Sequence, residues 1–428
     1  MLTEELGGLE AAREALARER LEELQALART YRNWSVKELA QALGRQPGRL
    51  VPESGMPKID LVVGLARALD WPVEAVVDHL MKPPSTGRRQ AVQQDAPADY
   101  ANLYNESLQR RLDRDYAEAI RLAVRAGAVA DNPTRRAAAL IVEAQTHEAM
   151  GSYSESVRCL RAATRIDGVS ADWRLYGDAN LANMMFMQGH TTQAVGIATS
   201  VLEYGEKLQP TVITRMARML AHWSRGNVLR AAIPLSAETS AWMPLAESAR
   251  TEFRSAHALG SELVSEVSER PIYFATFVSC IEPLVLELDA VCDESAAERA
   301  IDALLAIVRD ASQGDLGAGE RKAWAATALA ATAKRFAVEE MQERGLLELA
   351  SAALRAHAVA TSNWFFAHRH LEIDAERRRA LTGNAMAPRA LDAVEAKLVA
   401  GVLGQIPAAR EDAAEFMALY AGREGGRP

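Results

Sequence analysis

The chain has 428 residues, of which 49% are hydrophobic, 25% charged and 6% aromatic. This composition is typical of a globular protein with two or three domains, and it excludes a disordered or collagen-like chain. The formal charge of −8 excludes polyanion binding over the whole surface, so any nucleic-acid site must be a local basic module. Because Ala and Leu dominate and β-branched or aromatic alternation is scarce, we predict an all-α protein.

The cysteines and the apolar segments argue against disulfide bonds, a bound metal and a membrane-spanning helix. Cys159, Cys280 and Cys292 form no CxxC pair and have no histidine at metal-ligand spacing, so we expect neither a disulfide framework nor a bound metal. The acidic start does not resemble a signal peptide. The longest apolar windows, 271–281 and 323–333, are about half as long as the roughly 20 residues that cross a bilayer. We therefore expect a soluble cytoplasmic protein without a membrane partner.

The N-terminal region, residues 1–81, is predicted to be a small domain of five short helices. A rough helical stripe covers residues 9–32. Ser35 and Glu38 then have the spacing of a capping box, which predicts a two-turn helix that ends at Gly44.

Two further helices complete this domain and carry a family resemblance. An amphipathic stretch covers Ile59–Leu69, and a last helix covers residues 72–80, which start with a proline. Residues 18–81 resemble a helix-turn-helix domain of the Cro/repressor (Xre) type. In that family a short helix, here Val36–Leu43, crosses the phosphate backbone, and the next helix, here beginning at Arg45, lies in the major groove.

The segment Arg45–Pro52 departs from the family pattern because it holds two prolines and a glycine, which limit a recognition helix to about two turns or a loop. The charge nevertheless favours DNA, since six basic and two acidic residues between Arg29 and Lys58 give a net charge of +4. The resemblance implies phosphate contacts from this region and base contacts from Gln46 and Arg49. The residues that we expect to contact DNA are Lys37, Arg45, Gln46, Arg49 and Lys58. The alternative is a domain that has lost DNA binding and serves as a docking or dimerisation module.

An internal repeat begins after residue 98. The segments RDYAEA, GSYSES, GHTTQA and GNVLRA start at Arg114, Gly151, Gly189 and Gly226, which are 37, 38 and 37 residues apart. Small residues recur five positions after the first residue of each segment and, in the first three units, seven positions before it, as Ser107, Ala144 and Ala182. This spacing resembles the tetratricopeptide repeat (TPR), although each unit is longer than the family's ~34 residues.

The TPR resemblance implies a right-handed α-solenoid of helical hairpins. Residues 82–98 hold three prolines and no apolar periodicity, and they are predicted to be a linker. Four TPR-like repeats are expected in 99–240, a degenerate helical solenoid in 241–421 and a disordered tail in 422–428. Gln313–Gly319 is predicted to be a loop, and Gly345 marks a further candidate hairpin turn.

The TPR resemblance also implies a peptide-binding groove, because the first helix of each hairpin lines the inner surface in that family. Asn183 stands where family members place an asparagine that clamps the backbone of a bound peptide. The implied lining is Tyr104, Arg111, Ile141, Gln145, Asn183, Phe186, Met216, Leu220 and Trp223. Two alternatives remain open: Phe186, Met216 and Trp223 are equally suited to helix packing, and Arg111 is placed to pair with Asp115.

The combination of an Xre-type domain and a TPR solenoid resembles the peptide-pheromone-sensing transcription regulators of bacteria and phages, which act in quorum sensing. The resemblance implies a homodimer that binds double-stranded DNA and a short peptide. The alternative function is a TPR adaptor whose degenerate helix-turn-helix domain does not bind DNA. An enzyme is not expected, since GxSxG, Walker, HExxH and GxGxxG motifs are missing, and no catalytic residue, cofactor or metal is predicted.

Overall fold

The computed structural model describes residues 34–52, 57–69, 99–233, 239–267, 271–310, 316–336, 339–382 and 392–410, with single residues of 14–32 and 73–80. The regular elements of these residues are all helices, which confirms the predicted all-α class. Contacts divide the chain into unit 1, Met1–Pro97, and unit 2, Ala98–Pro428. The predicted linker, 82–98, and the predicted tail both lie outside the described residues.

Unit 1 contains α2 (Val36–Ala42), the 3₁₀ helix η1 (Pro47–Arg49) and α3 (Ile59–Leu69). The predicted capping box is present, because Ser35 Oγ accepts from Glu38 N at 3.3 Å and Glu38 Oε2 accepts from Ser35 N at 2.7 Å. Gly44 follows α2 with a φ of +63°, a left-handed conformation that glycine adopts without strain. The buried core of this unit includes Leu21, Leu24, Leu39, Leu65 and Leu69.

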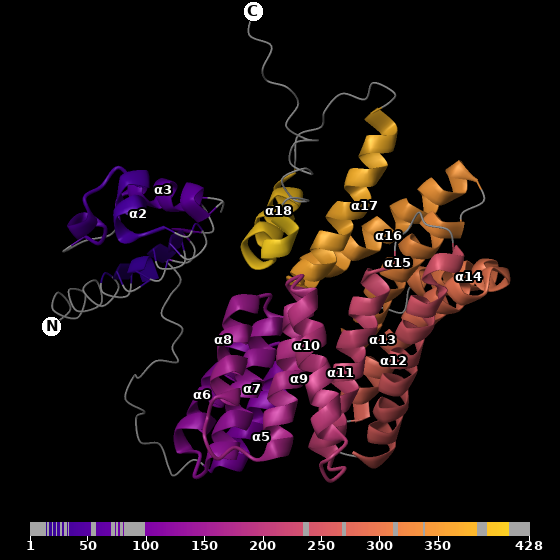
Figure 1. The fold of residues 1–428 in the computed structure, drawn as a ribbon, viewed down its shortest axis with the longest axis horizontal. Helices are drawn as coiled ribbons and strands as arrows, with labels where there is room; N and C mark the ends of the chain where they lie inside the picture. The colour runs from indigo at the N-terminus through magenta and orange to yellow at the C-terminus, as the bar shows by residue number, and fades with distance from the viewer. Residues whose placement is uncertain are drawn as a thin grey trace, which may run out of the picture. The chain divides into compact units, whose positions relative to one another are not determined.

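Unit 2 is a series of helices in which each packs against the next (Figure 1). The first six helices are α5 (Tyr100–Leu112), α6 (Tyr116–Val129), α7 (Pro133–Ala149), α8 (Tyr153–Thr164), α9 (Ala171–Met187) and α10 (Thr191–Gly205). The next helices are α11 (Val212–Ala231), α12 (Thr239–Glu266), α13 (Pro271–Cys292), η2 (Glu294–Ala296), α14 (Ala297–Arg309) and α15 (Leu316–Phe336). The last are α16 (Glu340–Thr361), α17 (Trp364–Thr382), α18 (Ala393–Gln405) and η3 (Pro407–Ala409).

The first three predicted turns are confirmed at the α5–α6, α7–α8 and α9–α10 connections. Arg114, Gly151 and Gly189 have φ values of +63°, +74° and +81° there, so these turns need a left-handed residue. The small residues of the repeat are buried where helices cross, with Ala144 and Ala182 at 1% and 0% exposure. The repeat spacing therefore located the first three hairpins.

The fourth predicted turn is wrong, because Gly226 lies inside α11. A Cβ at this glycine would lie 3.0–3.1 Å from the Phe253 ring, so the small residue allows α12 to approach closely instead of ending the helix. Two later expectations also fail for the described residues. Leu316–Gly319, the second half of the predicted loop, belongs to α15, and Gly345 lies within α16.

The C-terminal helices of unit 2 pack against its N-terminal hairpins. Trp364 Nε1 at the start of α17 donates to Gly151 O at 2.9 Å, across 213 residues of sequence. Gln405 Oε1 at the end of α18 accepts from Tyr153 N at 3.1 Å. The last helices of the series therefore contact the α7–α8 hairpin. No helix in the described part of the chain is both long and apolar enough to span a bilayer.

Candidate functional site

Polar side chains from three successive repeat helices lie together in unit 2. They are Arg111 on α5, Gln145 and Glu148 on α7, and Tyr176, Asn180 and Asn183 on α9. We call these six residues the polar cluster. Each of α5, α7 and α9 is the first helix of a hairpin, and α7 packs against both of the others. The repeat thus brings residues 34 and 35 positions apart into hydrogen-bonding distance.

Gln145 connects the three helices of the polar cluster. Its Oε1 accepts from Arg111 Nη1 at 3.0 Å, and its Nε2 donates to Tyr176 Oη at 2.8 Å and to Asn180 Oδ1 at 3.1 Å. Gln145, Tyr176 and Asn180 are 5–8% exposed, so the inner part of the cluster is buried and hydrogen-bonded. This arrangement fixes the side chains in one geometry, because an unpaired buried amide is costly.

Asn183 and Glu148 form the more accessible edge of the polar cluster together with Arg111. Asn183 Nδ2 donates to Glu148 Oε1 at 3.2 Å. Asn183 Oδ1 is buried and has no hydrogen-bond partner among the described residues. One acceptor of this amide therefore receives no donor from the described residues.

Glu148 is in an environment that disfavours its charged form. Burial, together with the nearby negative charge of Glu320 on α15, raises its pKa to about 7, and Arg111 opposes this shift. Glu148, at the edge of the polar cluster, therefore lies near a second carboxylate, that of Glu320, and a cationic group would relieve their repulsion.

The other residues that were predicted to line the groove have hydrophobic neighbours. Phe186 and Trp223 are 4% and 6% exposed, and Ile141 and Leu220 are also buried. Tyr104 stacks on Tyr100 at 5.6 Å between ring centroids, and the partly buried Met216 packs against the main core. Arg111 has Gln145 as a partner, whereas Asp115 pairs with Arg110 at 3.8 Å.

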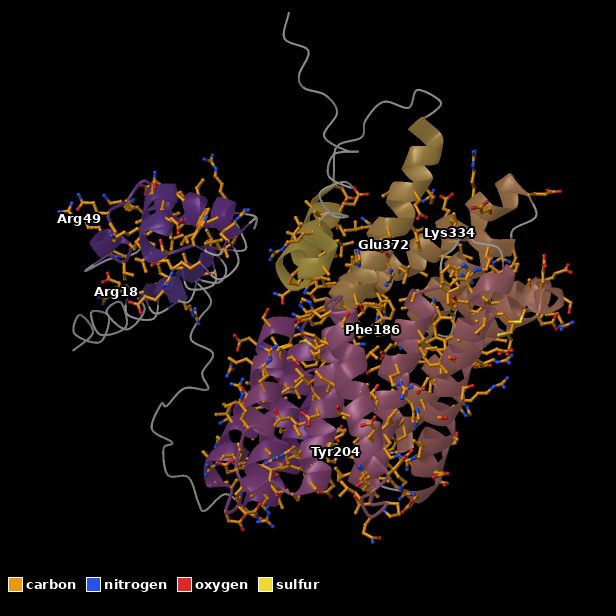
Figure 2. All side chains as sticks on the ribbon, viewed as in Figure 1. Arg18, Arg49, Phe186, Tyr204, Lys334 and Glu372 are labelled. Carbon is orange, nitrogen blue, oxygen red and sulfur yellow. The ribbon has the colours of Figure 1, made fainter. Side chains whose placement is uncertain are left out.

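A continuous series of aromatic contacts connects Phe186 to Trp223. Phe186 lies 5.3 Å from Phe365 on α17, Phe365 lies 5.4 Å from Trp324 on α15, and Trp324 lies 5.0 Å from Trp223. These rings join α9, α11, α15 and α17 (Figure 2, where Phe186 is labelled). Side chains therefore fill the space between these helices, and the accessible polar surface lies toward α5, α7 and α9.

The predicted DNA-contacting residues lie around a very short element in unit 1. The segment that follows α2 forms only η1, three residues of 3₁₀ helix, and Leu50 after it is buried in the core. Arg45 forms an ion pair with Asp60 at 2.5 Å, and Lys37, Gln46, Arg49 and Lys58 are exposed. Arg49 is labelled in Figure 2.

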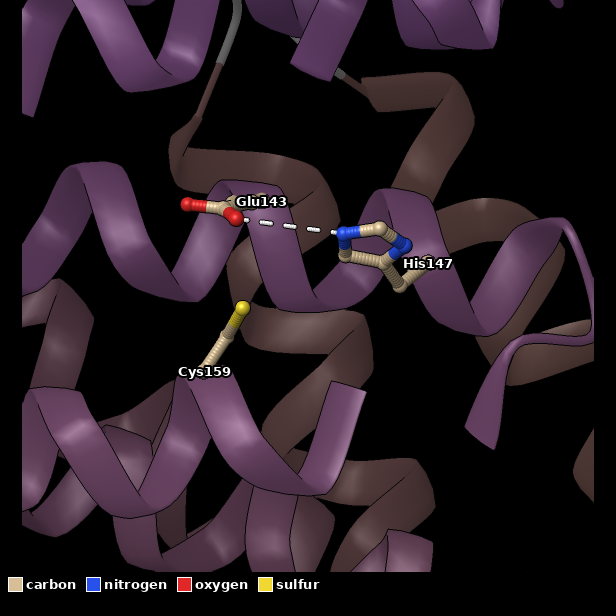
Figure 3. Close-up of side chains that lie close together, drawn as sticks. All are labelled: Glu143, His147 and Cys159. Carbon is tan, nitrogen blue, oxygen red and sulfur yellow. Dashed lines mark ion pairs between the residues drawn. The ribbon is translucent and has the colours of Figure 1, made fainter. Parts of the chain in front are cut away.

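Three members of the polar cluster and one further group of side chains were not predicted from the sequence. Glu148 lies three residues after the predicted Gln145. Tyr176 and Asn180 lie seven and three residues before the predicted Asn183. These spacings keep side chains on the same side of a helix. In addition, Glu143, His147 and Cys159 lie close enough together to bind a metal ion, although the sequence predicted no metal ligand (Figure 3). Glu143 and His147 are four residues apart on α7, and Cys159 is on α8.

The fold thus defines an all-α protein that is built from sequential helical hairpins. No protein-family model matches the chain, and no curated protein does. Among solved structures, a crystal structure of a Rap protein complexed with competence and sporulation factor matches with a TM-score of 0.43 and 14% sequence identity. The match covers 92% of this chain and 99% of that chain.

Proposed function

We propose that the protein is an interaction protein whose hairpin region binds an extended peptide or protein segment at the polar cluster. The observation that carries this proposal is the amide of Asn183, which is held by Glu148 and keeps one acceptor without a partner among the described residues. An extended peptide offers backbone N–H donors at a regular spacing. Side chains of successive repeat helices are well placed to bind several of them in a row.

The rest of the polar cluster supports this binding mode. Gln145 is fixed by Arg111, Tyr176 and Asn180, so the surface next to Asn183 is already ordered before a ligand arrives. A preordered surface loses little conformational entropy on binding. Glu148 and Glu320 favour a peptide that places a lysine, an arginine or a free amino terminus beside them, since a cation relieves their repulsion.

Unit 1 is better suited to docking than to reading DNA sequence. A helix-turn-helix protein reads bases with a helix inserted in the major groove, and η1 is a single turn that ends at Arg49. Val36 and Ile59, which begin α2 and α3, are 40% and 68% exposed. We therefore propose that unit 1 binds protein, which corresponds to the adaptor function that was the alternative from sequence.

The peptide-binding proposal is tested with peptides that are selected from a random library on the full chain and then measured by calorimetry. Asn183→Ala is expected to weaken their binding by roughly 1–3 kcal/mol, or about 5- to 150-fold, because backbone groups of the peptide lose their partner. The control is Gln193→Ala, an exposed side chain on α10, which should bind as the wild type does. Equal binding by the Asn183→Ala protein would contradict the proposal.

A DNA-binding regulator is the second candidate, because Lys37, Gln46, Arg49 and Lys58 are exposed on unit 1. This function predicts that the protein shifts random duplex DNA in a gel at low salt. It also predicts that Lys37→Ala makes the slope of log affinity against log salt shallower by about one unit. The adaptor proposal predicts no shift at any salt concentration.

A further inference from the structure

Glu143, His147 and Cys159 form a compact group inside the α7–α8 hairpin, apart from the polar cluster. One potential ligand atom from each residue lies within 4.8 Å of those of the other two (Figure 3). Cys159 is fully buried, and the side chains of His147 and Glu143 are 8% and 12% exposed. We call these three residues the hairpin triad.

His147 makes the hairpin triad unusual as a structural feature. Its Nδ1 is buried and has no hydrogen-bond partner among the described residues. Its Nε2 lies 3.8 Å from Glu143 Oε1, which is longer than a hydrogen bond. A buried imidazole nitrogen without a hydrogen bond costs free energy, so the packing of α7 against α8 alone does not explain the position of Nδ1.

We propose that the hairpin triad is a binding site for a zinc-type divalent cation, with Glu143, His147 and Cys159 as its three protein ligands. A carboxylate, an imidazole and a thiolate are the donors that Zn²⁺ prefers, and two negative charges among them balance the charge of the ion. Tetrahedral zinc with bonds of about 2.0–2.3 Å places its ligand atoms roughly 3.3–3.8 Å apart. The separations in the triad therefore close to this geometry with small side-chain rotations.

Arg158 contacts the triad and would have to move when an ion binds. Arg158 is the cation that faces it, since Nη2 lies 3.7 Å from Glu143 Oε1 and 3.5 Å from Cys159 Sγ. The Arg158 side chain is 50% exposed and is also bound by Glu155 at 2.8 Å. It can therefore turn toward Glu155 and solvent when a metal ion takes its place.

The site does not depend on the proposed peptide-binding function. Successive helical residues are rotated by about 100°, so Gln145 and Glu148 point roughly 140–200° away from Glu143 on α7. A bound ion would connect α7 to α8 on the side of α7 opposite the polar cluster. The two proposals therefore fail or succeed separately.

The test uses the full chain without an affinity tag, freed of metal by dialysis and then titrated with Co²⁺ and with Zn²⁺. We expect one ion per chain, a thiolate-to-cobalt charge-transfer band in the near ultraviolet, and a higher melting temperature with Zn²⁺. Cys159→Ser should remove the band and the thermal shift. Cys280→Ser, which changes another buried thiol outside the triad, should retain both.

Glu143→Gln keeps the shape of a partly exposed side chain and serves as the second variant. It should fold as the wild type does by circular dichroism and bind Zn²⁺ at least tenfold more weakly. The proposal is overturned if the wild type shows no cobalt–thiolate band, if the band persists in Cys159→Ser, or if it disappears in Cys280→Ser.

Discussion

Glu148 shows how a single residue of the polar cluster responds to its surroundings. It accepts from Asn183 and faces the negative charge of Glu320, and its pKa is raised to about 7. Between the ordinary glutamate pKa of 4.5 and about 7, the folded protein holds this proton while the unfolded chain has released it. The free energy of unfolding therefore falls as the pH rises through this interval, as far as Glu148 is concerned.

Glu148→Gln tests this electrostatic effect. The variant keeps an oxygen acceptor for Asn183 but carries no charge, so its stability relative to the wild type should increase from pH 5 to pH 7.5. Denaturant unfolding at both pH values measures the difference. The variant must be compared with the wild type at each pH, because two buried histidines also titrate. Burial lowers the pKa of His357 to about 4 and lowers that of His370, so their contribution to the free energy of unfolding rises with pH. A constant difference across this range would contradict the raised pKa.

The sequence located part of the polar cluster because the repeat sets a register. The TPR register selected Arg111, Gln145 and Asn183, and the structure places all three in hydrogen-bonded positions. Glu148 stands three residues before its turn, as Arg111 and Phe186 do, but it was not predicted, and its raised pKa has no local signal because the charge of Glu320 comes from α15. Phe186 and Trp223 share the same register, but helices of the C-terminal half cover them.

At the scale of elements, the turns between helices depend on left-handed residues. Gly151 in the α7–α8 turn has a φ of +74°, and a Cβ there would collide with Ser362 O and the Trp364 ring. Gly196 within α10 is exposed, and a Cβ there would meet no atom within 4 Å. The same substitution therefore has opposite consequences at the two positions.

Gly151→Ala is expected to lower the free energy of unfolding by at least about 2 kcal/mol, because strain in the left-handed region and the collision add up. Gly196→Ala should raise it by about 0.5–1 kcal/mol, since alanine favours a helix interior. Denaturant unfolding of both variants measures these changes. Similar effects of the two substitutions would show that the turn geometry is wrong.

Glycines predicted the ends of helices only where the glycine lies in a turn. They failed where the glycine instead allows two helices to approach closely. Gly151 and Gly189 end helices, as their spacing predicted. Gly226 has the same spacing, yet α11 continues through it to Ala231 because the glycine contacts Phe253 on the next helix. A close helix approach and a turn require the same small residue, so the sequence alone does not separate them.

At the scale of unit 2, closure between distant helices is the feature that local sequence patterns do not encode. The contacts join residues more than 200 positions apart, and no repeat period relates them. Tyr153 is central to them: it is fully buried, and its hydroxyl donates to Asn363 Oδ1 at 3.1 Å and accepts from Phe365 N at 3.3 Å. In an open solenoid each repeat contacts only its neighbours, whereas these bonds connect the second helix pair to the α16–α17 connection.

Tyr153→Phe removes only the hydroxyl that makes these two hydrogen bonds and leaves the ring in place. It should lower the free energy of unfolding by roughly 1–3 kcal/mol, because Phe365 N and Asn363 lose a buried partner. Hydrogen exchange should speed up both at the start of α8 and at the start of α17. Tyr204→Phe is the matched control, since Tyr204 on α10 is 62% exposed and its hydroxyl should contribute little. Faster exchange confined to α8 would show that the two ends of unit 2 unfold independently and that closure does not stabilise the molecule as a whole.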